Sequence, residues 1–361
     1  MGLLGPVLGL VSESTINLFR ALSPFFATLA LIMLLFEGGL HLNFYKIMRE
    51  FSKATFFTLL NFALTVLFST AILLFFKWDL LSAIFLSVAV GGTSSTVIIP
   101  LIRNSKAKEK TKTILSLESA ITDPLCVIFA LAVLQFMVSD VVNVQIIFKN
   151  LASAFSVATV IGFITGLIWL RILDKFEEAR EFGYLVTTAV VFLLYAITEI
   201  IGGNGAFSTF VFGIVLGNGA RITKMLRMKE LVLDTEIVKF QAELSMFIKT
   251  FFFVYIGMIF SFVNLSYRVL LITALLLLVG IVLPRFISSE FLARYIDSTA
   301  RDKRMLRFMM ARGLASAVLI TYSLNLGIQN QFLLKAEVIA FLIILLTNLI
   351  TSIGFYVSEH H

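Results

Sequence analysis

The feature that most constrains this chain is a series of apolar runs, each about 20 residues long, separated by short charged segments. A helix of that length crosses the hydrocarbon core of a bilayer. The 361 residues are 59% hydrophobic, against roughly 45–50% in a soluble domain. We therefore expect an all-α membrane protein. Its eleven predicted spans are residues 22–40, 53–77, 80–101, 110–138, 147–172, 183–202, 205–218, 240–263, 267–290, 304–325 and 334–358.

The basic residues of the connecting segments support this number of spans. Lys46, Arg49 and Lys53 follow the first span, whereas only Lys77 follows the second. Along the whole chain this alternation gives 21 lysines and arginines in one set of loops and four in the other. The positive-inside rule assigns the basic set, and the C-terminus with it, to the cytoplasm. We expect a multi-pass protein of the plasma membrane, whose net charge of +7 reflects its loops and not nucleic-acid binding.

Ionisable side chains inside the spans are informative, because each is costly at membrane depth and usually faces a protein interior or a water-filled cavity. Four lie near span ends, where reaching the interface or forming a local ion pair is the simpler explanation. These four are Glu37, Glu199, Lys249 and Glu290. The remaining four, in which we expect function, are Glu118, Asp123, Arg285 and Arg312.

Glu118 and Asp123 belong to one predicted helix, with the sequence LSLESAITDPLCVIF. Because they are five residues apart, they face different sides of that helix, and Ser119 and Thr122 form a polar strip between them. Pro124 lacks an N–H, so one carbonyl of the preceding turn has no helical donor. Carboxylates, hydroxyls and a free carbonyl suit a small dehydrated alkali cation better than a soft metal. The alternative is that each acid pairs with a buried arginine.

Two of the spans are interrupted by polar sequence. In the third span, Gly91 and Gly92 favour a break in the helix, and the hydroxyls of residues 93–96 could satisfy the backbone that the break exposes. In the tenth span, RGLASAV begins at Arg312 and matches GGTSSTV of the third span at three of seven positions. These spans run in opposite directions. Interrupted segments in corresponding places of two halves indicate a transport site near the bilayer midplane, where Arg312 could compensate helix dipoles.

Several sequence strings together resemble the cation–proton antiporters of the NhaP-like kind. They occur in the order of that family and cover nearly the whole chain. The most specific is the pattern of acid, serine, polar residue, aspartate and proline from Glu118 to Pro124. The strings are LLFEGGLHLN, GGTSSTVIIPL, LESAITDPL, FSTFVFGIVLGN, FFFVYIGM and ARGLASAVL.

The resemblance implies an inverted-repeat antiporter fold of the NhaA/NhaP-like kind, with thirteen membrane helices, two of them crossed and unwound. The eleven spans fit this fold if its first two helices are largely missing, and the third and tenth spans then become the unwound pair. The chain would be a single transmembrane transporter domain, 1–361. Its first half would consist of an N-terminal helix remnant at 1–10 and of first-repeat helices and following spans in 11–218. A cytoplasmic amphipathic linker at 219–239 would connect this half to second-repeat helices in 240–358, followed by a possible tag remnant at 360–361.

The resemblance also implies roles for single residues. Asp123 would bind the cation and the proton in turn, while Glu118 would hold the site together through Arg285 in the ninth span. Thr93, by its main chain or hydroxyl, and Ser119 would help to coordinate the ion. A Na⁺ site would therefore consist of Asp123, Glu118, Ser119 and Thr93.

Three further residues would support this site: Arg312 at the helix crossing, Thr122 and Ser94. The last two depart from the family's usual pattern, because Ser94 stands where an aspartate is usual and Thr122 where asparagine is common. A serine-rich crossing is more like that of potassium-efflux antiporters. We expect Na⁺ as the first choice, with Li⁺ as a second candidate and K⁺/H⁺ antiport as the alternative function.

The expected mechanism is competition between a cation and a proton for Asp123. Burial raises the pKa of a carboxyl and a nearby cation lowers it, so such a group can hold either partner near neutral pH. The protonated and ion-loaded forms are both neutral and can cross between inward and outward states, whereas the bare carboxylate should not. With Glu118 paired to Arg285, we expect one-for-one, electroneutral exchange. Without that pairing, Glu118 could carry a second proton.

Other classes of membrane protein fit the sequence less well. A sodium-coupled solute symporter would need more donors to line a pocket for an organic substrate, which we do not expect. A channel would show a filter ring or a voltage-sensing arginine series. An enzyme, also not expected, would need a catalytic group, but His41 is in a loop and Cys126 in an apolar helix. We expect no cofactor, and the bilayer and a second copy of the chain as partners.

Overall fold

The computed structural model describes residues 13–42, 54–138, 144–175, 180–225, 235–259, 267–296, 298–326 and 330–360. Every regular element within these ranges is a helix. Three interpretations of the sequence fall wholly or partly outside the described residues: the helix remnant at 1–10, the middle of the linker, at 226–234, and the second residue of the possible tag, His361.

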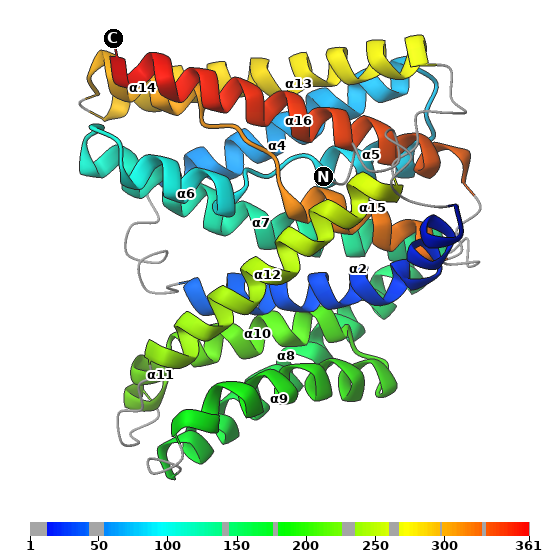
Figure 1. Ribbon diagram of the computed structural model, residues 1–361, viewed down its shortest axis with the longest axis vertical. Helices are drawn as coiled ribbons and strands as arrows, with labels where there is room; N and C mark the ends of the chain where they lie inside the picture. The colour runs from blue at the N-terminus through cyan, green and yellow to red at the C-terminus, as the bar shows by residue number, and fades with distance from the viewer. Residues whose placement is uncertain are drawn as a thin grey trace. The chain divides into compact units, whose positions relative to one another are not determined.

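Fourteen helices are described, most of them as long apolar rods (Figure 1). They are α2 (Glu13–His41), α4 (Ala54–Phe75), α5 (Leu80–Ala89), α6 (Ser95–Arg103), α7 (Glu109–Val138), α8 (Val144–Lys175), α9 (Arg180–Ile200), α10 (Gly205–Gly217), α11 (Gly219–Met225), α12 (Thr235–Ile259), α13 (Tyr267–Tyr295), α14 (Ala300–Phe308), α15 (Leu314–Asn325) and α16 (Gln331–His360).

The chain is a multi-pass membrane protein. Six of the described helices are long and apolar enough to cross a membrane, and a seventh span results if α10 and α11, which are bent by 79°, form one. The predicted third span is two helices in the structure, α5 and α6, and most of the predicted tenth is divided between α14 and α15. Each piece is too short to span alone, so the total of eleven spans stays a prediction.

The described helices form two compact units. One unit contains α4 to α7 and α13 to α16, and the other contains most of α2, α8 to α11 and most of α12. In the second unit, α10 packs against α2 through glycines. A Cβ added to Gly213 would fall within 3.2 Å of the Cα of Gly39, so side chains there would push these helices apart. The rings of Phe36 and Phe212 stack beside this contact, with their centroids 5.7 Å apart.

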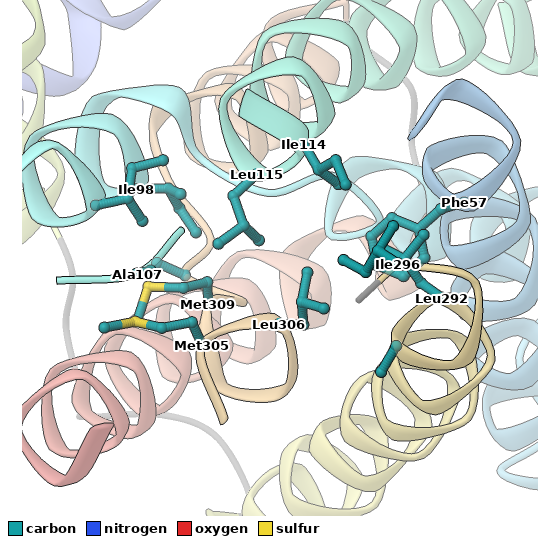
Figure 2. Close-up of a cluster of buried hydrophobic side chains, with 13 residues drawn as sticks. Phe57, Ile98, Ala107, Ile114, Leu115, Leu292, Ile296, Met305, Leu306 and Met309 are labelled. Atoms are coloured by element: carbon teal, nitrogen blue, oxygen red, sulfur yellow. The ribbon is translucent and has the colours of Figure 1, made fainter. Parts of the chain in front are cut away.

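In the first unit, the short helices α6 and α14 are held by a buried hydrophobic cluster (Figure 2). The cluster joins them to α4, α7 and α13, and its members are at most 8% exposed. Its labelled side chains are Phe57, Ile98, Ala107, Ile114, Leu115, Leu292, Ile296, Met305, Leu306 and Met309. Helices of nine residues are marginal by themselves. Their positions are therefore set by this packing.

A buried carboxylate ties the segment between α6 and α7 to the start of α14. Asp302 and Thr299 form a capping box, in which the backbone N–H of Thr299 donates to the carboxylate over 2.9 Å and the Thr299 hydroxyl accepts the Asp302 N–H over 3.2 Å. The Thr299 hydroxyl also donates to the same carboxylate oxygen over 2.6 Å. The other carboxylate oxygen accepts the backbone N–H of Lys108 over 3.0 Å. Asp302 is fully buried, so its loss would leave donors from two segments without a partner.

We expect Asp302 to make the stability of the fold depend on pH. Burial acts to raise the pKa of its carboxyl, but the hydrogen bonds from Thr299 and Lys108 outweigh it and hold the pKa below the usual range. Because the folded-state pKa is the lower one, its stabilisation is complete above about pH 4 and is lost as the pH falls through the folded-state value. Asp302→Asn should cost about 1–3 kcal/mol at neutral pH and progressively less in acid.

Thermal melts of both proteins between neutral and acidic pH would measure this. Glu109→Gln is a suitable control, because that carboxylate is 86% exposed and should not affect the melting temperature. A difference between wild type and Asp302→Asn that does not change with pH would show that the charge of Asp302 is not responsible.

Candidate functional site

Two interrupted helices meet in the first unit. The chain leaves helical geometry between Ala89 and Ser95, where the glycine pair predicted a break, and again between Phe308 and Leu314. The N–H of Ser94 in the first break donates to the carbonyl of Ala311 in the second over 2.8 Å. The two breaks therefore lie against each other and are joined through their main chains.

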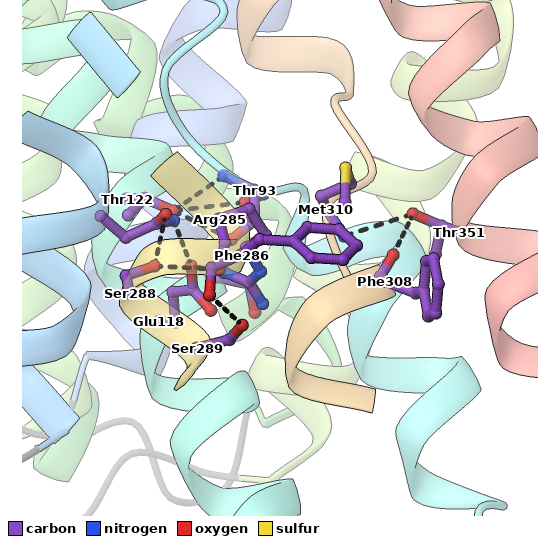
Figure 3. Close-up of polar contacts among 12 residues, drawn as sticks. Thr93, Glu118, Thr122, Arg285, Phe286, Ser288, Ser289, Phe308, Met310 and Thr351 are labelled. Atoms are coloured by element: carbon purple, nitrogen blue, oxygen red, sulfur yellow. Dashed lines mark hydrogen bonds and ion pairs between the residues drawn. The ribbon is translucent and has the colours of Figure 1, made fainter. Parts of the chain in front are cut away.

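Side chains of α16 satisfy the backbone of the second break (Figure 3). The N–H of Arg312 donates to the Thr347 hydroxyl over 3.1 Å, and its carbonyl accepts from the Asn348 amide over 2.8 Å. The Thr351 hydroxyl donates to the carbonyl of Phe308 over 3.0 Å and accepts the N–H of Met310 over 3.3 Å. Without these partners the break would bury unpaired peptide groups.

Side chains of helix α7 provide hydrogen-bond partners for the backbone of the first break. The N–H of Thr93 donates to the Thr122 hydroxyl over 3.0 Å, and the two hydroxyls lie 3.3 Å apart. Gly92 packs so closely on this helix that an added Cβ would fall 2.9 Å from the carbonyl oxygen of Thr122. The predicted residues Thr93 and Thr122 are thus direct neighbours, with carbonyl and hydroxyl oxygens on both.

Asp123 lies at the beginning of α6. One oxygen of its carboxylate accepts the backbone N–H of Ser95 over 3.1 Å and the Ser95 hydroxyl over 2.6 Å. Ser95 is the first residue of α6, so the carboxylate lies at the positive end of a helix dipole and accepts one of its free N–H groups. Asp123 itself is only partly buried. This arrangement stabilises a negative charge on a carboxyl that still has an accessible side.

Glu118 forms the centre of a second polar group on another side of α7. It makes an ion pair with Arg285 of α13, and both side chains are 1% exposed. The amide of Asn61 in α4 donates to the same carboxylate over 3.0 Å, and the Ser288 hydroxyl donates to Asn61 over 3.0 Å (Figure 3). The Arg285 guanidinium also lies 5.5 Å from the ring centroid of Phe57. The expected pairing of Glu118 and Arg285 is present.

The remaining predicted residues lie near these groups. Arg312 is 1% exposed in the second break, and two of its guanidinium nitrogens, Nε and Nη1, have no hydrogen-bond partner among the described residues. It interacts electrostatically with Glu118 and Asp123. Ser94 is buried in the first break and contacts the Thr96 hydroxyl over 3.1 Å. Ser119 is buried on α7 and donates to the carbonyl of Ser116.

Several residues of this arrangement were missed as site residues from the sequence. Ser95 was considered only as part of a hydroxyl run, although its N–H and its hydroxyl both donate to the Asp123 carboxylate. Asn61, Thr347 and Asn348 were not considered at all. The signal was present, because each is a polar residue inside an apolar run, as in TLLNFALTV and LLTNLITS.

The described residues contain no group of three or more His, Cys, Asp or Glu side chains that could hold a metal ion. The oxygens near Asp123 come instead from one carboxylate, hydroxyls and main-chain carbonyls. This donor set suits a weakly held alkali cation rather than a resident transition metal.

Comparison with protein families and curated proteins gave the following matches. The family described as sodium/hydrogen exchanger, transmembrane, matches residues 1–358. The K(+)/H(+) antiporter NhaP2 of Shewanella sp. strain ANA-3 is 20% identical over 196 residues, which are 53% of this chain and 34% of that protein. The K(+)/H(+) antiporter NhaP2 of Shewanella baltica is 20% identical over 198 residues, with the same two shares. The match thus spans about a third of the length of these relatives.

Two solved structures are similar in fold. The sodium proton antiporter MjNhaP1 from Methanocaldococcus jannaschii at pH 8 has a TM-score of 0.76 at 19% identity, over 99% of this chain and 90% of that one. An electron-microscopy structure of MjNhaP1 has a TM-score of 0.66 at 18% identity, over 98% and 86%. At these identities the similarity establishes the fold.

The contact between the two breaks can be tested at Gly313. The three atoms nearest to a Cβ added there all belong to Ser94, whose own Cβ would lie 2.6 Å away. Gly313→Ala should therefore overpack the contact and lower the free energy of unfolding by about 1–3 kcal/mol. Adding Ser94→Gly should restore most of the loss, because it removes the atoms that clash. Thermal melts of both variants and of Ser94→Gly alone measure this, and no rescue would contradict the arrangement.

The buried pair of Glu118 and Arg285 should be strongly coupled in stability. Glu118→Gln or Arg285→Met alone leaves one charge buried without a partner and should cost about 3–5 kcal/mol. The double variant should cost much less than the sum of the two, which a double-mutant cycle by chemical denaturation would measure. Glu290→Gln is the control, because its ion pair with Arg307 is partly exposed and its loss should change the stability little. Additive effects would rule out the coupling.

Proposed function

The chain belongs to the sodium/hydrogen exchanger family, and from this premise we propose that it exchanges a monovalent cation for protons by alternating access. The observation that carries the proposal is the position of Asp123. Its carboxylate is held by the first residue of α6, beside two helix breaks, and is only partly buried. The family is one of transporters, and no catalytic chemistry or cofactor is needed for this function.

The transported cation would bind at the Asp123 carboxylate. The two Ser95 hydrogen bonds stabilise the ionised form of this carboxylate, which is only partly buried. Oxygens of Thr93 and Thr122 lie next to the same turn of α7, and Ser119 is one turn away on that helix. We propose that Thr93 and Ser119 supply ligands directly. Glu118 would support the site indirectly, since its carboxylate already bonds Arg285 and Asn61.

The charges favour one-for-one, electroneutral exchange. Glu118 and Arg285 cancel each other, and Arg312 adds a buried positive charge that interacts with Asp123. The site with a proton on Asp123 and the site with Na⁺ on Asp123 then carry the same net charge. Exchange is electroneutral because the two loaded sites carry equal charge. From the sequence we had expected each loaded form to be neutral, but this is not required. The site with a bare carboxylate differs from both by one unit of charge.

Na⁺ is our first choice of cation, with Li⁺ as a second candidate. The solved structures with a similar fold are of a sodium proton antiporter, whereas the curated relatives are K(+)/H(+) antiporters. Ser94, in place of the family's usual aspartate, lowers the negative charge near the breaks, which also suits the potassium alternative. The sodium-coupled solute symporter is a more distant alternative.

The proposal extends to the architecture. The pairs α5–α6 and α14–α15 would be the two crossed, unwound membrane helices of an inverted-repeat fold with thirteen helices. The protein would work in the plasma membrane, with its C-terminus in the cytoplasm, as a homodimer. We keep the division expected from the sequence, with first-repeat helices and the following spans in 11–218 and second-repeat helices in 240–358.

Transport measurements on purified protein in liposomes would test the function. We expect Na⁺, Li⁺ or K⁺ added outside to drive protons out of the liposomes, as reported by an internal pH dye, and clamping the voltage at zero to leave the rate unchanged. Asp123→Asn cannot exchange a proton at this position and should reduce the rate to that of protein-free liposomes.

Glu199→Gln is the matched control, because it changes a carboxyl that bonds the N–H of Gly205 in the other unit, and it should retain transport. Proton movement that persists in Asp123→Asn would show that Asp123 is not the residue that exchanges the proton. No proton movement with any cation, from a protein that melts cooperatively, would favour the solute symporter.

A further inference from the structure

A line of buried polar side chains runs along α4, away from the group around Glu118. Thr58, Asn61, Thr65 and Ser69 are spaced three or four residues apart and therefore share one face of the helix. Each is at most 2% exposed. From Asn61 to Ser69 the line extends about 12 Å along the helix axis. Of this line, only Asn61 takes part in the exchange proposed above.

This face of α4 packs against α13, and the two helices are antiparallel. Asn61 accepts a hydrogen bond from Ser288, whereas Ser69 lies against Gly280, where an added Cβ would fall 3.4 Å from the Ser69 hydroxyl. An increase of eight residues along α4 thus corresponds to a decrease of eight along α13. Thr65, midway between Asn61 and Ser69, therefore lies opposite the region of Pro284.

Pro284 changes the hydrogen bonding of α13 at this level. It lies inside the helix and has no N–H, so the carbonyl of Gly280 lacks its donor four residues later. That carbonyl points along the helix towards Pro284, which is the level of Thr65. Gly280 also has no side chain to cover it. An acceptor without a helical partner is therefore present in the same buried interface as the α4 hydroxyls.

Four polar atoms in this interface have no hydrogen-bond partner among the described residues. They are the hydroxyls of Thr65 and Ser69, both 0% exposed, and Nε and Nη2 of Arg285, which is 1% exposed. Arg285 directly follows Pro284. Buried polar groups in native proteins are almost always paired, either with protein or with ordered water. Hydroxyls and guanidinium nitrogens without partners, beside a carbonyl whose helical donor is replaced by a proline, indicate a ligand in this interface.

We propose that a file of bound water molecules lies between α4 and α13, from the guanidinium of Arg285 past Thr65 to Ser69. Guanidinium nitrogens only donate, a carbonyl only accepts and hydroxyls do both, so the ligand must both donate and accept. Arg285 would repel a cation, and the adjacent Glu118 carboxylate would repel an anion. Water fits all these groups and is the usual partner of such sites.

The file would hydrate the buried ion pair from the side opposite Asp123. The guanidinium of Arg285 has more donors than Glu118 can satisfy, and water on Nε and Nη2 stabilises its charge in the interior. It also gives the Glu118–Arg285 pair a contact with water that does not pass through the cation site. The α4–α13 interface is then a hydrated element of the first unit rather than a dry one.

X-ray hydroxyl-radical labelling with mass spectrometry tests this, because radicals form from water that lies beside a side chain. Ile281 is one turn before Arg285 on α13, and Ile343 is on α16; both are 0% exposed. We expect Ile281 to be labelled several-fold faster than Ile343 in the wild-type protein. Equal, slow labelling of both would overturn the proposal.

Substitution of the hydroxyls gives a second test. The sign of the change in melting temperature distinguishes a hydrated interface from a dry one. If waters bind there, Thr65→Val with Ser69→Ala should remove the fast labelling of Ile281 and lower the melting temperature, because the remaining polar groups lose their partners. If the interface is dry, the same change removes unpaired hydroxyls and should raise the melting temperature, which would refute the proposal. Thr273→Val is the control, since that hydroxyl is bonded to the carbonyl of Val269 and should change neither measurement. None of these measurements depends on transport.

Discussion

The structure of the first unit depends on pairing the backbone groups that two interrupted helices expose. An unpaired peptide group at membrane depth costs several kcal/mol, roughly the effect of losing a buried side chain. The two breaks meet this requirement by bonding to each other, through Ser94 and Ala311, and to hydroxyls and amides of α7 and α16. Because those partners are fixed on long helices, the ends of α6 and α15 are fixed as well.

This pairing also positions the charged groups. Asp123 bonds the first residue of α6 only because the break ends there, and Arg312 is buried because its own N–H and carbonyl belong to the second break. Glu118 is on the same helix as Asp123 but in a different environment, where Arg285 and Asn61 surround it. Two carboxylates on one helix thus have different partners, one structural and one with an accessible side.

Much of this arrangement could be predicted from residue type and spacing. Gly91 and Gly92 predicted the first break, and the five-residue spacing of Glu118 and Asp123 predicted that they face different sides of α7. The family was identified from sequence strings and is shown by the match over residues 1–358. The partners of the breaks could not be predicted, because Thr347, Asn348 and Ser95 are ordinary polar residues until the fold brings them to a particular peptide group.

The sequence alone therefore determined the class of the protein, since the lengths of its apolar runs and the distribution of its basic residues are local properties that a bilayer selects directly. It also determined which buried charges to examine, because an ionisable residue in an apolar run is recognisable without a structure. Only the tertiary structure decided that Asp123 is bonded by Ser95, that Arg312 shares its environment, and that the face of α4 with buried hydroxyls packs against α13, the helix of Arg285. These are contacts between segments up to about two hundred residues apart, and no local pattern encodes which of many chemically equivalent partners will meet.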